Sequence, residues 1–507
     1  MKRFLCAVLT STLTFSLPIF AQRTGNDWMT DGFDAQRSYW VRRDAKIDAQ
    51  SMGKPGFDLV WKIPMKNQAR GLNNITAPML LDFYIGYRGF RTLGFFGGSS
   101  GNVIAVDTDI ARLEWDRSFA AGSAKATALC PGGMTSAVTR PTSSGYPAAA
   151  APRGVGRGSA AQSGVGEPLE GAVTLKNRRA PRPAPPAPPT RAARRTATAG
   201  NPFARSPLLI LALAWDGLLH SMYVSNGEEP KPAVKFLPPN AHAIGLVSFD
   251  NAVYAATVNG CGGVPDGIWG LDTESGKVTN WKASAGVAGS TGFAADPDGN
   301  LYVASGKQLV VLAPGTLSQK STASAGAAFS SSPLLFDFKD NDMVAATTAD
   351  GKLRVFDSGL KEVAAADAGV GGYEVGALTS WQEEDGTRWL LVPGSKGVTA
   401  WKFAGTGLEK GWESREMVSA LTPAVVSGAV FVISSGEKRD GELEARVKGS
   451  RPAVLYALDG ATGKELWSSG TAMTSFVHSG GLSIGGTRVY VSTFDGTQYA
   501  FGFPIEH

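Results

Sequence analysis

Apart from its 44 Asp and Glu, this 507-residue sequence has few side chains for acid–base or metal chemistry, because it holds only four histidines and three cysteines. Glu374 lies in the stretch Gly-Gly-Tyr-Glu-Val-Gly, and His242 and His478 occupy corresponding places in the repeat described below. A carboxylate, imidazoles and hydroxyls around one axis would make a polar binding site. The candidate ligand-binding residues are Asn74, Thr76, Thr135, His242, Ser332, Glu374, Thr422 and His478. The alternative is that the hydroxyl residues cap strands and that the histidines are ordinary loop residues.

Motifs of common catalytic machinery are missing from the sequence. It has no His-Glu-x-x-His pair for zinc and no Gly-Lys-Ser/Thr loop for phosphate. No cysteine has the spacing of a zinc site or of covalent haem attachment. We therefore predict no catalytic residue and assign no metal ligand.

The first 21 residues have the pattern of a secretory signal peptide. Lys2 and Arg3 precede an apolar stretch that ends at Phe20, and the small residue Ala21 precedes Gln22. The alternative is a buried N-terminal helix. No other apolar run reaches the roughly 20 residues that a membrane-spanning helix needs. We expect a periplasmic or secreted protein without an integral membrane segment.

The cysteines bear on the same question of compartment. Cys6 lies within the predicted signal peptide, too early to be a lipid-attachment site, so Cys130 and Cys261 would remain in the mature chain. An even number of cysteines in an exported chain permits one disulfide bond. Two buried free thiols are the alternative, and the sequence leaves both open.

A basic insertion accounts for the net charge of +5. Residues 140–205 carry eleven Arg and Lys against two Glu, and they are rich in Pro, Ala and Gly. Such a composition buries too little apolar surface to offset chain entropy, so we predict a disordered loop. The segment has no interleaved aromatic residues. We therefore expect it to be a solvated loop that does not bind nucleic acid.

A repeat indicates the elements that would position these side chains. Residues 105–115, 270–281 and 457–467 each place an Asp eight or nine residues before a Trp, with turn residues between them. Each copy is typical of two strands joined by a tight turn. Together with weaker copies, they recur about every 41 to 57 residues from Asp272 onward. Short strands at this period predict an all-β fold, a β-propeller with four-stranded blades.

The repeat predicts eight blades and a way of closing the ring. The predicted blades span residues 76–119, 130–236, 242–283, 286–322, 325–367, 371–414, 417–468 and 471–503. The last blade lacks an outer strand, and residues 57–62 have the pattern of that strand. We therefore predict a signal peptide at 1–21, an N-terminal extension at 22–56, and a propeller at 57–507 that the N-terminal strand closes. The insertion at 140–205 falls within blade two.

The repeat at 457–467, Ala-x-Asp-x-x-Thr-Gly-Lys-x-x-Trp, resembles the tryptophan-docking repeat of the pyrroloquinoline-quinone (PQQ) propeller superfamily. Residues 27–38 resemble the stretch that precedes the first blade in those proteins. The resemblance covers nearly the whole mature chain except the insertion. It implies that Trp115, Trp281 and Trp467 pack between blades as structural docking residues. The family includes alcohol and sugar dehydrogenases that hold PQQ and Ca²⁺ on the ring axis, and also cofactor-free scaffold proteins.

Two functional hypotheses follow from this resemblance. The sequence has neither the adjacent cysteines of many of those dehydrogenases nor a recognisable set of Glu, Asn and Asp ligands for calcium. Our first hypothesis is a monomeric binding or scaffold module without a cofactor, for a protein, peptide or glycan partner at the propeller face. The alternative is a PQQ-dependent oxidoreductase with a diverged site, in which Glu374 would be a metal ligand.

Overall fold

The computed structural model describes residues 27–86, 89–119, 125–142, 144–145 and 208–504. The chain divides into two units, residues 1–148 with 209–507 and residues 149–208. The second unit lies outside the described residues except for Leu208. The fold described here is that of the first unit.

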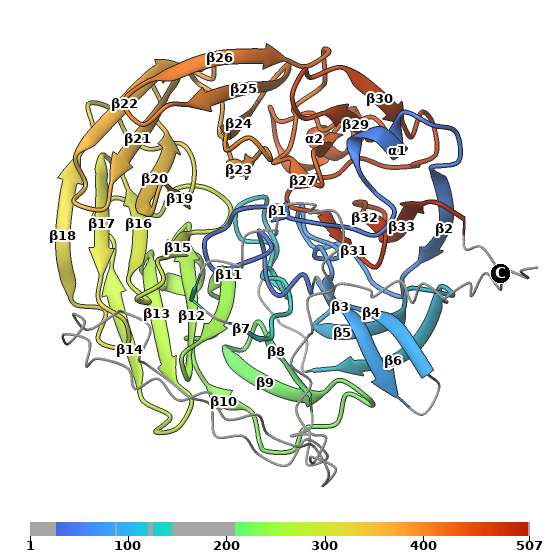
Figure 1. Cartoon of the computed structure of the whole chain (residues 1–507). Helices are drawn as coiled ribbons and strands as arrows, with labels where there is room; N and C mark the ends of the chain where they lie inside the picture. The colour runs from blue at the N-terminus through green and yellow to red at the C-terminus, as the bar shows by residue number, and fades with distance from the viewer. Residues whose placement is uncertain (1–26, 87–88, 120–124, 143, 146–207, 505–507) are drawn as a thin grey trace, which may run out of the picture. The chain divides into compact units, whose positions relative to one another are not determined.

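Eight mainly antiparallel sheets follow one another around a central axis as the blades of a β-propeller (Figure 1). The predicted fold class is therefore confirmed. Blade 1 contains β3 (Met79–Gly86), β4 (Gly89–Gly98), β5 (Asn102–Asp107) and β6 (Arg112–Ser118). Blade 2 contains β8 (Leu209–Leu213), β9 (Leu218–Tyr223) and β10 (Val234–Lys235), and Thr139 bridges Leu211 on the inner side.

Blades 3 to 5 repeat the four-stranded plan. Blade 3 contains β11 (His242–Phe249), β12 (Ala252–Val258), β13 (Gly267–Asp272) and β14 (Val278–Lys282), with a short 3-10 helix, η1 (Cys261–Gly263), between β12 and β13. Blade 4 contains β15 (Phe293–Ala295), β16 (Leu301–Ser305), β17 (Gln308–Leu312) and β18 (Gln319–Ser324). Blade 5 contains β19 (Leu334–Phe338), β20 (Asn341–Thr347), β21 (Lys352–Asp357) and β22 (Glu362–Asp367).

Blades 6 to 8 complete the ring. Blade 6 contains β23 (Thr379–Gln382), β24 (Arg388–Gly394), β25 (Gly397–Phe403) and β26 (Leu408–Glu413). Blade 7 contains β27 (Ala424–Val426), β28 (Ala429–Ser434), β29 (Val454–Asp459) and β30 (Glu465–Ser468). Blade 8 contains β31 (Leu482–Gly485), β32 (Arg488–Ser492) and β33 (Thr497–Gly502).

The N-terminal strand supplies the outer strand of blade 8, as the sequence predicted. β2 (Asp58–Pro64) pairs antiparallel with β33, from Asp58 opposite Gly502 to Pro64 opposite Thr497. Without β2, the outer edge of β33 would be left unpaired, and exposed strand edges favour aggregation. The two ends of the chain thus share one sheet.

Apolar contacts between neighbouring blades form the core. Residues 429–433 of β28, Ala-Val-Phe-Val-Ile, are all fully buried, because both faces of the blade pack against its neighbours. Trp115 packs on Gly227 of the next blade, and its Nε1 donates a hydrogen bond to the carbonyl of Val224 at 3.0 Å. Trp412 of blade 6 repeats this relationship with blade 7, donating to the carbonyl of Gly460 at 2.8 Å.

Trp281 and Trp467 occupy the same outer-strand position but are only half-buried. Trp281 packs against the core cluster shared by blades 3 and 4. Trp467 packs edge-on against Phe57 and Phe501, at ring-centroid distances of 4.9 and 5.5 Å.

Residues 28–41, the crossing segment, run across the inner strands before the first blade begins. Their backbone and side chains make hydrogen bonds to one residue or more in each of seven blades: Leu80, Thr139, Leu246, Ala295, Leu335, Ser380 and Val425. At the end of the segment, β1 (Trp40–Val41) pairs in parallel with β27. The crossing segment therefore closes one end of the central channel.

Arg37 is the centre of this closure and is fully buried. Its guanidinium donates to the carbonyls of Phe293 at 3.0 Å and Gly245 at 2.7 Å, which belong to different blades. It also donates to the carbonyl of Asp31 and the hydroxyl of Thr30 within the segment. One side chain thus ties the crossing segment to blades 3 and 4.

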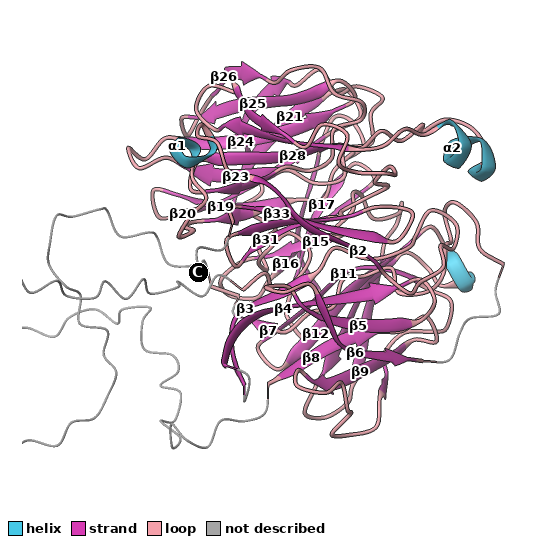
Figure 2. Cartoon of the chain, turned by 90° about the vertical axis from the view of Figure 1, so that its right-hand side faces the viewer, coloured by secondary structure: helices cyan, strands magenta, loops and turns pink. Residues whose placement is uncertain are grey.

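The two short α-helices mark opposite faces of the ring (Figure 2). α1 (Ala49–Met52) lies on one face, and α2 (Leu443–Gly449) projects from the other, within the long connection between β28 and β29. Among the described residues, no helix has the length and apolar character that crossing a membrane requires.

Part of the predicted insertion is described. β7 (Pro141–Thr142) pairs in parallel with β11, and the buried Ser144 hydroxyl bonds to Asp250 and to the carbonyl of Pro297. The prediction of disorder for residues 146–205 falls outside the described residues, as does the predicted signal peptide at 1–21.

Candidate functional site

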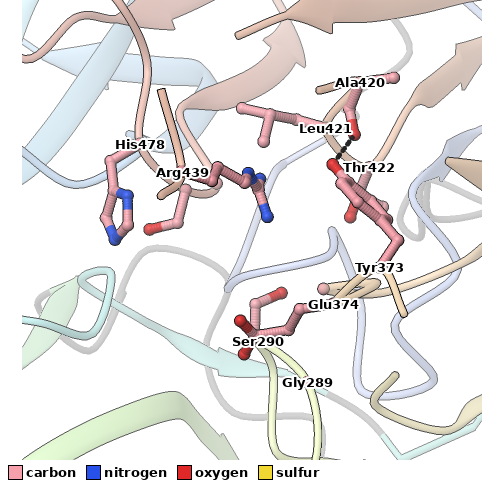
Figure 3. A pocket seen from close by; sticks show the side chains of 12 residues that line it. Gly289, Ser290, Tyr373, Glu374, Ala420, Leu421, Thr422, Arg439 and His478 are labelled. Atoms are coloured by element: carbon pink, nitrogen blue, oxygen red, sulfur yellow. Dashed lines mark hydrogen bonds between the residues drawn. The ribbon is translucent and has the colours of Figure 1, made fainter. Parts of the chain in front are cut away.

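A polar cavity of about 150 Å³ lies where the connections of four blades meet (Figure 3). Most of its walls come from loops that lead into the innermost strands, because in a propeller these loops converge on the axis. The cavity is lined by Gly289 and Ser290 of blade 4, Tyr373, Glu374 and Gly376 of blade 6, Ala420, Leu421, Thr422 and Arg439 of blade 7, and His478, Ser479 and Gly480 of blade 8.

Close backbone packing holds one wall of the cavity. The amides of Ser290 and Ser332 both donate to the carbonyl of Gly376, at 2.9 and 3.1 Å. A Cβ at Gly289, which has a φ of +77°, would lie 1.9 Å from the backbone nitrogen of Ser332. Glycine is therefore required there, since any side chain would separate the loops of blades 4 and 5.

A buried carboxylate organises the opposite wall. Glu437 is fully buried, and its carboxylate lies 2.5 Å from an Arg446 nitrogen and 3.0 Å from Nδ1 of His478. Burial by itself would raise the pKa of Glu437, but the hydrogen bonds of His478 and Arg446 and the charges of His478 and Arg439 outweigh it and lower the pKa below its usual range. The ionised Glu437 thus joins the connection at 435–453 to the loop that leads into blade 8.

Arg439 follows in the same connection and is directed into the cavity (Figure 3). Its guanidinium carbon lies 5.0 Å from the centroid of the Tyr373 ring, a cation–π contact. Its Nε lies 3.9 Å from the Glu437 carboxylate. The side chain is therefore held at its stem, while its terminal nitrogens face the cavity.

A disulfide bond joins Cys130, in the loop that leads into blade 2, to Cys261 in the connection between β12 and β13. The sequence left open either a disulfide bond or two free thiols, and the structure contains the disulfide bond. Next to it, the carbonyl of Leu129 lies 2.8 Å from Nδ1 of His242. Burial lowers the pKa of His242, and the nearby charge of His478 lowers it further.

The structure brings three of the eight predicted site residues to the cavity, namely Glu374, Thr422 and His478. His242 lies close enough to His478 for their charges to interact but does not line the cavity. The other four hold loops and strands together. Asn74 donates to the carbonyl of Phe494, Thr76 accepts from the amide of Gly97, Thr135 donates to the carbonyl of Ala243, and Ser332 accepts from the amides of Thr291 and Gly292.

Sequence reasoning missed Arg439, because it searched only the loops that lead into innermost strands. Arg439 comes from the connection between the second and third strands of blade 7, at residues 435–453. The corresponding connection has four residues in blade 5 (348–351) and two in blade 6 (395–396). The unusual length of the connection at 435–453 was the feature of the sequence that could have pointed to Arg439. Tyr373 was also missed, although it directly precedes Glu374.

The donor set of this cavity does not fit calcium. Ca²⁺ takes six to eight oxygen ligands, whereas the lining offers one carboxylate, Glu374, and places the cationic Arg439 in the same space. Within the described ranges, no three His, Cys, Asp or Glu side chains are grouped as metal ligands would be. The cavity is also smaller than the roughly 300–1,000 Å³ of sites that enclose a drug-sized ligand. The residues that line this cavity thus do not fit PQQ with Ca²⁺.

Neither family models nor curated proteins match this sequence. Solved structures do match. The quinohemoprotein alcohol dehydrogenase of Comamonas testosteroni has a TM-score of 0.56 at 13% identity, covering 95% of this chain and 82% of that one. A europium-containing methanol dehydrogenase has a TM-score of 0.54 at 10% identity, covering 94% and 98%. The computationally designed protein Ika8 has a TM-score of 0.51 at 14% identity, covering 88% and 100%.

Identities this low carry information about the fold and not about activity. They agree with the arrangement of eight sheets around one axis. The chain is an eight-bladed β-propeller, similar in fold to these two dehydrogenases.

Proposed function

We propose that this chain is an exported, monomeric binding module that receives a protein, peptide or glycan partner at the open mouth of its channel, without chemistry of its own. The observation that carries the proposal is the asymmetry of the channel. The crossing segment closes one end, and the polar cavity lies among the loops at the other. A surface of loops held by a rigid ring is a common arrangement for binding.

The character of the cavity supports binding over catalysis. Glu437 is already held by His478 and Arg446, so this buried carboxylate is engaged in a structural pair. Glu374 is exposed and lies against no activating partner among the described residues. Paired groups of this kind hold a surface in shape, whereas a general base needs a free acceptor near its substrate.

The alternative is a PQQ-dependent alcohol or sugar dehydrogenase. Two of the similar structures are dehydrogenases, but the likeness is one of fold. To act in this way, the cavity would have to enlarge and recruit oxygen ligands that it does not now present. The first experiment below therefore tests the binding module against a PQQ-dependent dehydrogenase.

The first test is calorimetric titration of the purified mature chain with PQQ, with and without Ca²⁺, together with a dye-linked alcohol and sugar oxidation assay. We expect no saturable heat and no dye reduction. Saturable, calcium-dependent binding accompanied by dye reduction would overturn the proposal and make the chain a quinoprotein oxidoreductase.

The second test locates the binding face by photo-crosslinking in the native host. One crosslinking side chain replaces Val418, which is 50% exposed and two residues from the cavity wall. The matched control replaces Ile110, which is 58% exposed in the turn after β5, away from the cavity. We expect one discrete adduct from position 418 and none from position 110. Equal labelling from both positions, or none from either, would contradict the proposal.

A further inference from the structure

We infer that the cavity is a receptor for a carboxylate group of a polypeptide partner, and that Arg439 is the residue that binds it. This inference rests on the proposed function, because it names the chemical group that the open mouth of the channel receives.

The first argument is the state of the Arg439 side chain. No described residue accepts a hydrogen bond from it, and its Nε is buried without an acceptor. The ring of Tyr373 supports the guanidinium plane, so little side-chain freedom remains to be lost on binding. A planar guanidinium held in this way presents paired N–H donors that match the two oxygens of a carboxylate.

The second argument is the balance of charge around the cavity. Glu437 is the one fully buried carboxylate here, and it faces two guanidinium groups, those of Arg439 and Arg446, as well as the imidazole of His478. Its oxygens lie 2.5 Å from Arg446 but 3.9 Å from Arg439, so its charge is closely paired with Arg446 only. Glu374 equals the second guanidinium in charge but forms no ion pair with Arg439, although both line the cavity. Arg439 therefore lacks a closely paired carboxylate, and its position favours an anionic group.

The third argument is size. The volume of about 150 Å³ is below the roughly 300–1,000 Å³ of sites that enclose a drug-sized ligand. It leaves room for a carboxylate and its first carbons. The size therefore fits a small anion, or the end or a side chain of something larger.

The fourth argument is the apolar surface beside the cavity, which favours a polypeptide over a free small anion. The exposed Val418 lies two residues from the cavity-lining Ala420. The connection that carries Arg439 also lines a second, open hollow of about 720 Å³, to which it contributes Leu443 and Val447 beside the charged Glu442, Glu444 and Lys448; Phe494 lines the same hollow. A partner could place its carboxylate on Arg439 and apolar side chains on these residues.

The test measures binding of random N-acetylated hexapeptide mixtures to the intact, disulfide-bonded mature chain by saturation-transfer NMR. One mixture has free C-terminal carboxylates and no acidic side chains. The second has the same sequences with C-terminal amides. The third consists of amides in which one position is aspartate. We expect the amide mixture without acid to bind at least tenfold more weakly than one of the carboxylate mixtures, and the stronger of those identifies the source of the carboxylate.

Variants then assign the effect to Arg439. Arg439→Gln removes the charge and should weaken carboxylate binding at least tenfold, and Arg439→Lys should restore part of it. The matched control is Lys438→Gln, because Lys438 carries the same charge one residue away and lies near Asp440 at 3.9 Å. It should bind as the wild type does. Glu374→Gln removes a like charge from the cavity and should tighten binding severalfold.

Equal binding of the carboxylate and amide mixtures would overturn the inference, as would absence of binding by all three at millimolar concentration or equal effects of Arg439→Gln and Lys438→Gln. These results are distinguishable from failure of the proposed function. If position 418 still crosslinks to one partner while Arg439→Gln changes nothing, the binding module stands and the carboxylate receptor does not.

Discussion

The Nδ1 atom of His478 lies 3.0 Å from both carboxylate oxygens of Glu437, which is fully buried between blades 7 and 8. Arg446 of α2 binds the same carboxylate. This three-residue contact fastens the connection at 435–453 to the ring and so places Arg439 in the cavity. The position of the binding residue therefore depends on a carboxylate that does not line the cavity.

Glu437→Gln should destabilise the fold and make its free energy of unfolding less dependent on pH. The substitution removes the buried carboxylate that Arg446 and His478 both contact, which costs about 3 kcal/mol at pH 7. Because the folded-state pKa of Glu437 is depressed, its contribution is present above the unfolded value of about 4.3 and is lost as pH falls through the folded value. Urea unfolding at a series of pH values measures this. The difference between wild type and variant should shrink on acidification; parallel curves would contradict it.

Arg37→Met should destabilise the ring by about 4 kcal/mol, since it leaves the buried carbonyls of Gly245 and Phe293 without their donor. Arg37→Lys should recover only part of the loss, because an ammonium cannot reproduce the planar fork. Chemical denaturation followed by tryptophan fluorescence measures both. A loss below about 1 kcal/mol for Arg37→Met would mean that the crossing segment contributes little to stability.

Removing residues 1–64 should prevent stable ring closure, because it deletes β2, which exposes the edge of β33, and also the crossing segment, which bonds to seven blades. The expected product is an oligomer or aggregate on size-exclusion chromatography. The control is a truncation at residue 26, which keeps the crossing segment and β2 and should remain monomeric. A monomeric 65–507 protein with the wild-type melting temperature would refute the closing role.

Replacing both Cys130 and Cys261 with serine should lower the free energy of unfolding by about 3 kcal/mol, because the bond joins residues 131 apart in the sequence. Mass spectrometry of the wild-type protein without reductant should find no free thiol at either position. Two free thiols, or unchanged stability in the double variant, would show that the bond does not form in solution.

Replacing residues 147–206 with a Gly/Ser linker of about ten residues should change the melting temperature by no more than a few degrees, because loop length adds only slowly to closure entropy. The replacement keeps Pro141 and Ser144, which pair with or contact the ring. Calorimetry measures the change. A large loss of stability would show that the predicted loop contains an element that the ring needs.

Sequence reasoning succeeded best for the fold. The Asp-to-Trp spacing at Asp459 and Trp467 identified the outer hairpin of a blade, because turn chemistry and strand alternation are local properties. The closing strand around Trp61 was also predictable, since the last blade lacked one strand in a repeat that otherwise held. The repeat thus predicted the pairing of β2 with β33, although these strands lie far apart in the sequence.

The candidate site was only partly predictable. Glu374, Thr422 and His478 could be placed near one axis because the repeat assigns them equivalent positions. The roles of Asn74 and Ser332 in holding loops together could not be told from ligand binding, since the same residue types serve both purposes.

The sequence by itself therefore determined the blade, its number of copies and the closure of the ring, because these follow from local turns and from a repeated pattern of apolar residues. Only the tertiary structure decided that Arg37 ties blades 3 and 4 together at one end of the channel, and that Arg439 faces the cavity at the other. Both residues belong to segments outside the repeat. Their surroundings depend on groups hundreds of residues away or on a single long connection, and no local spacing encodes such contacts.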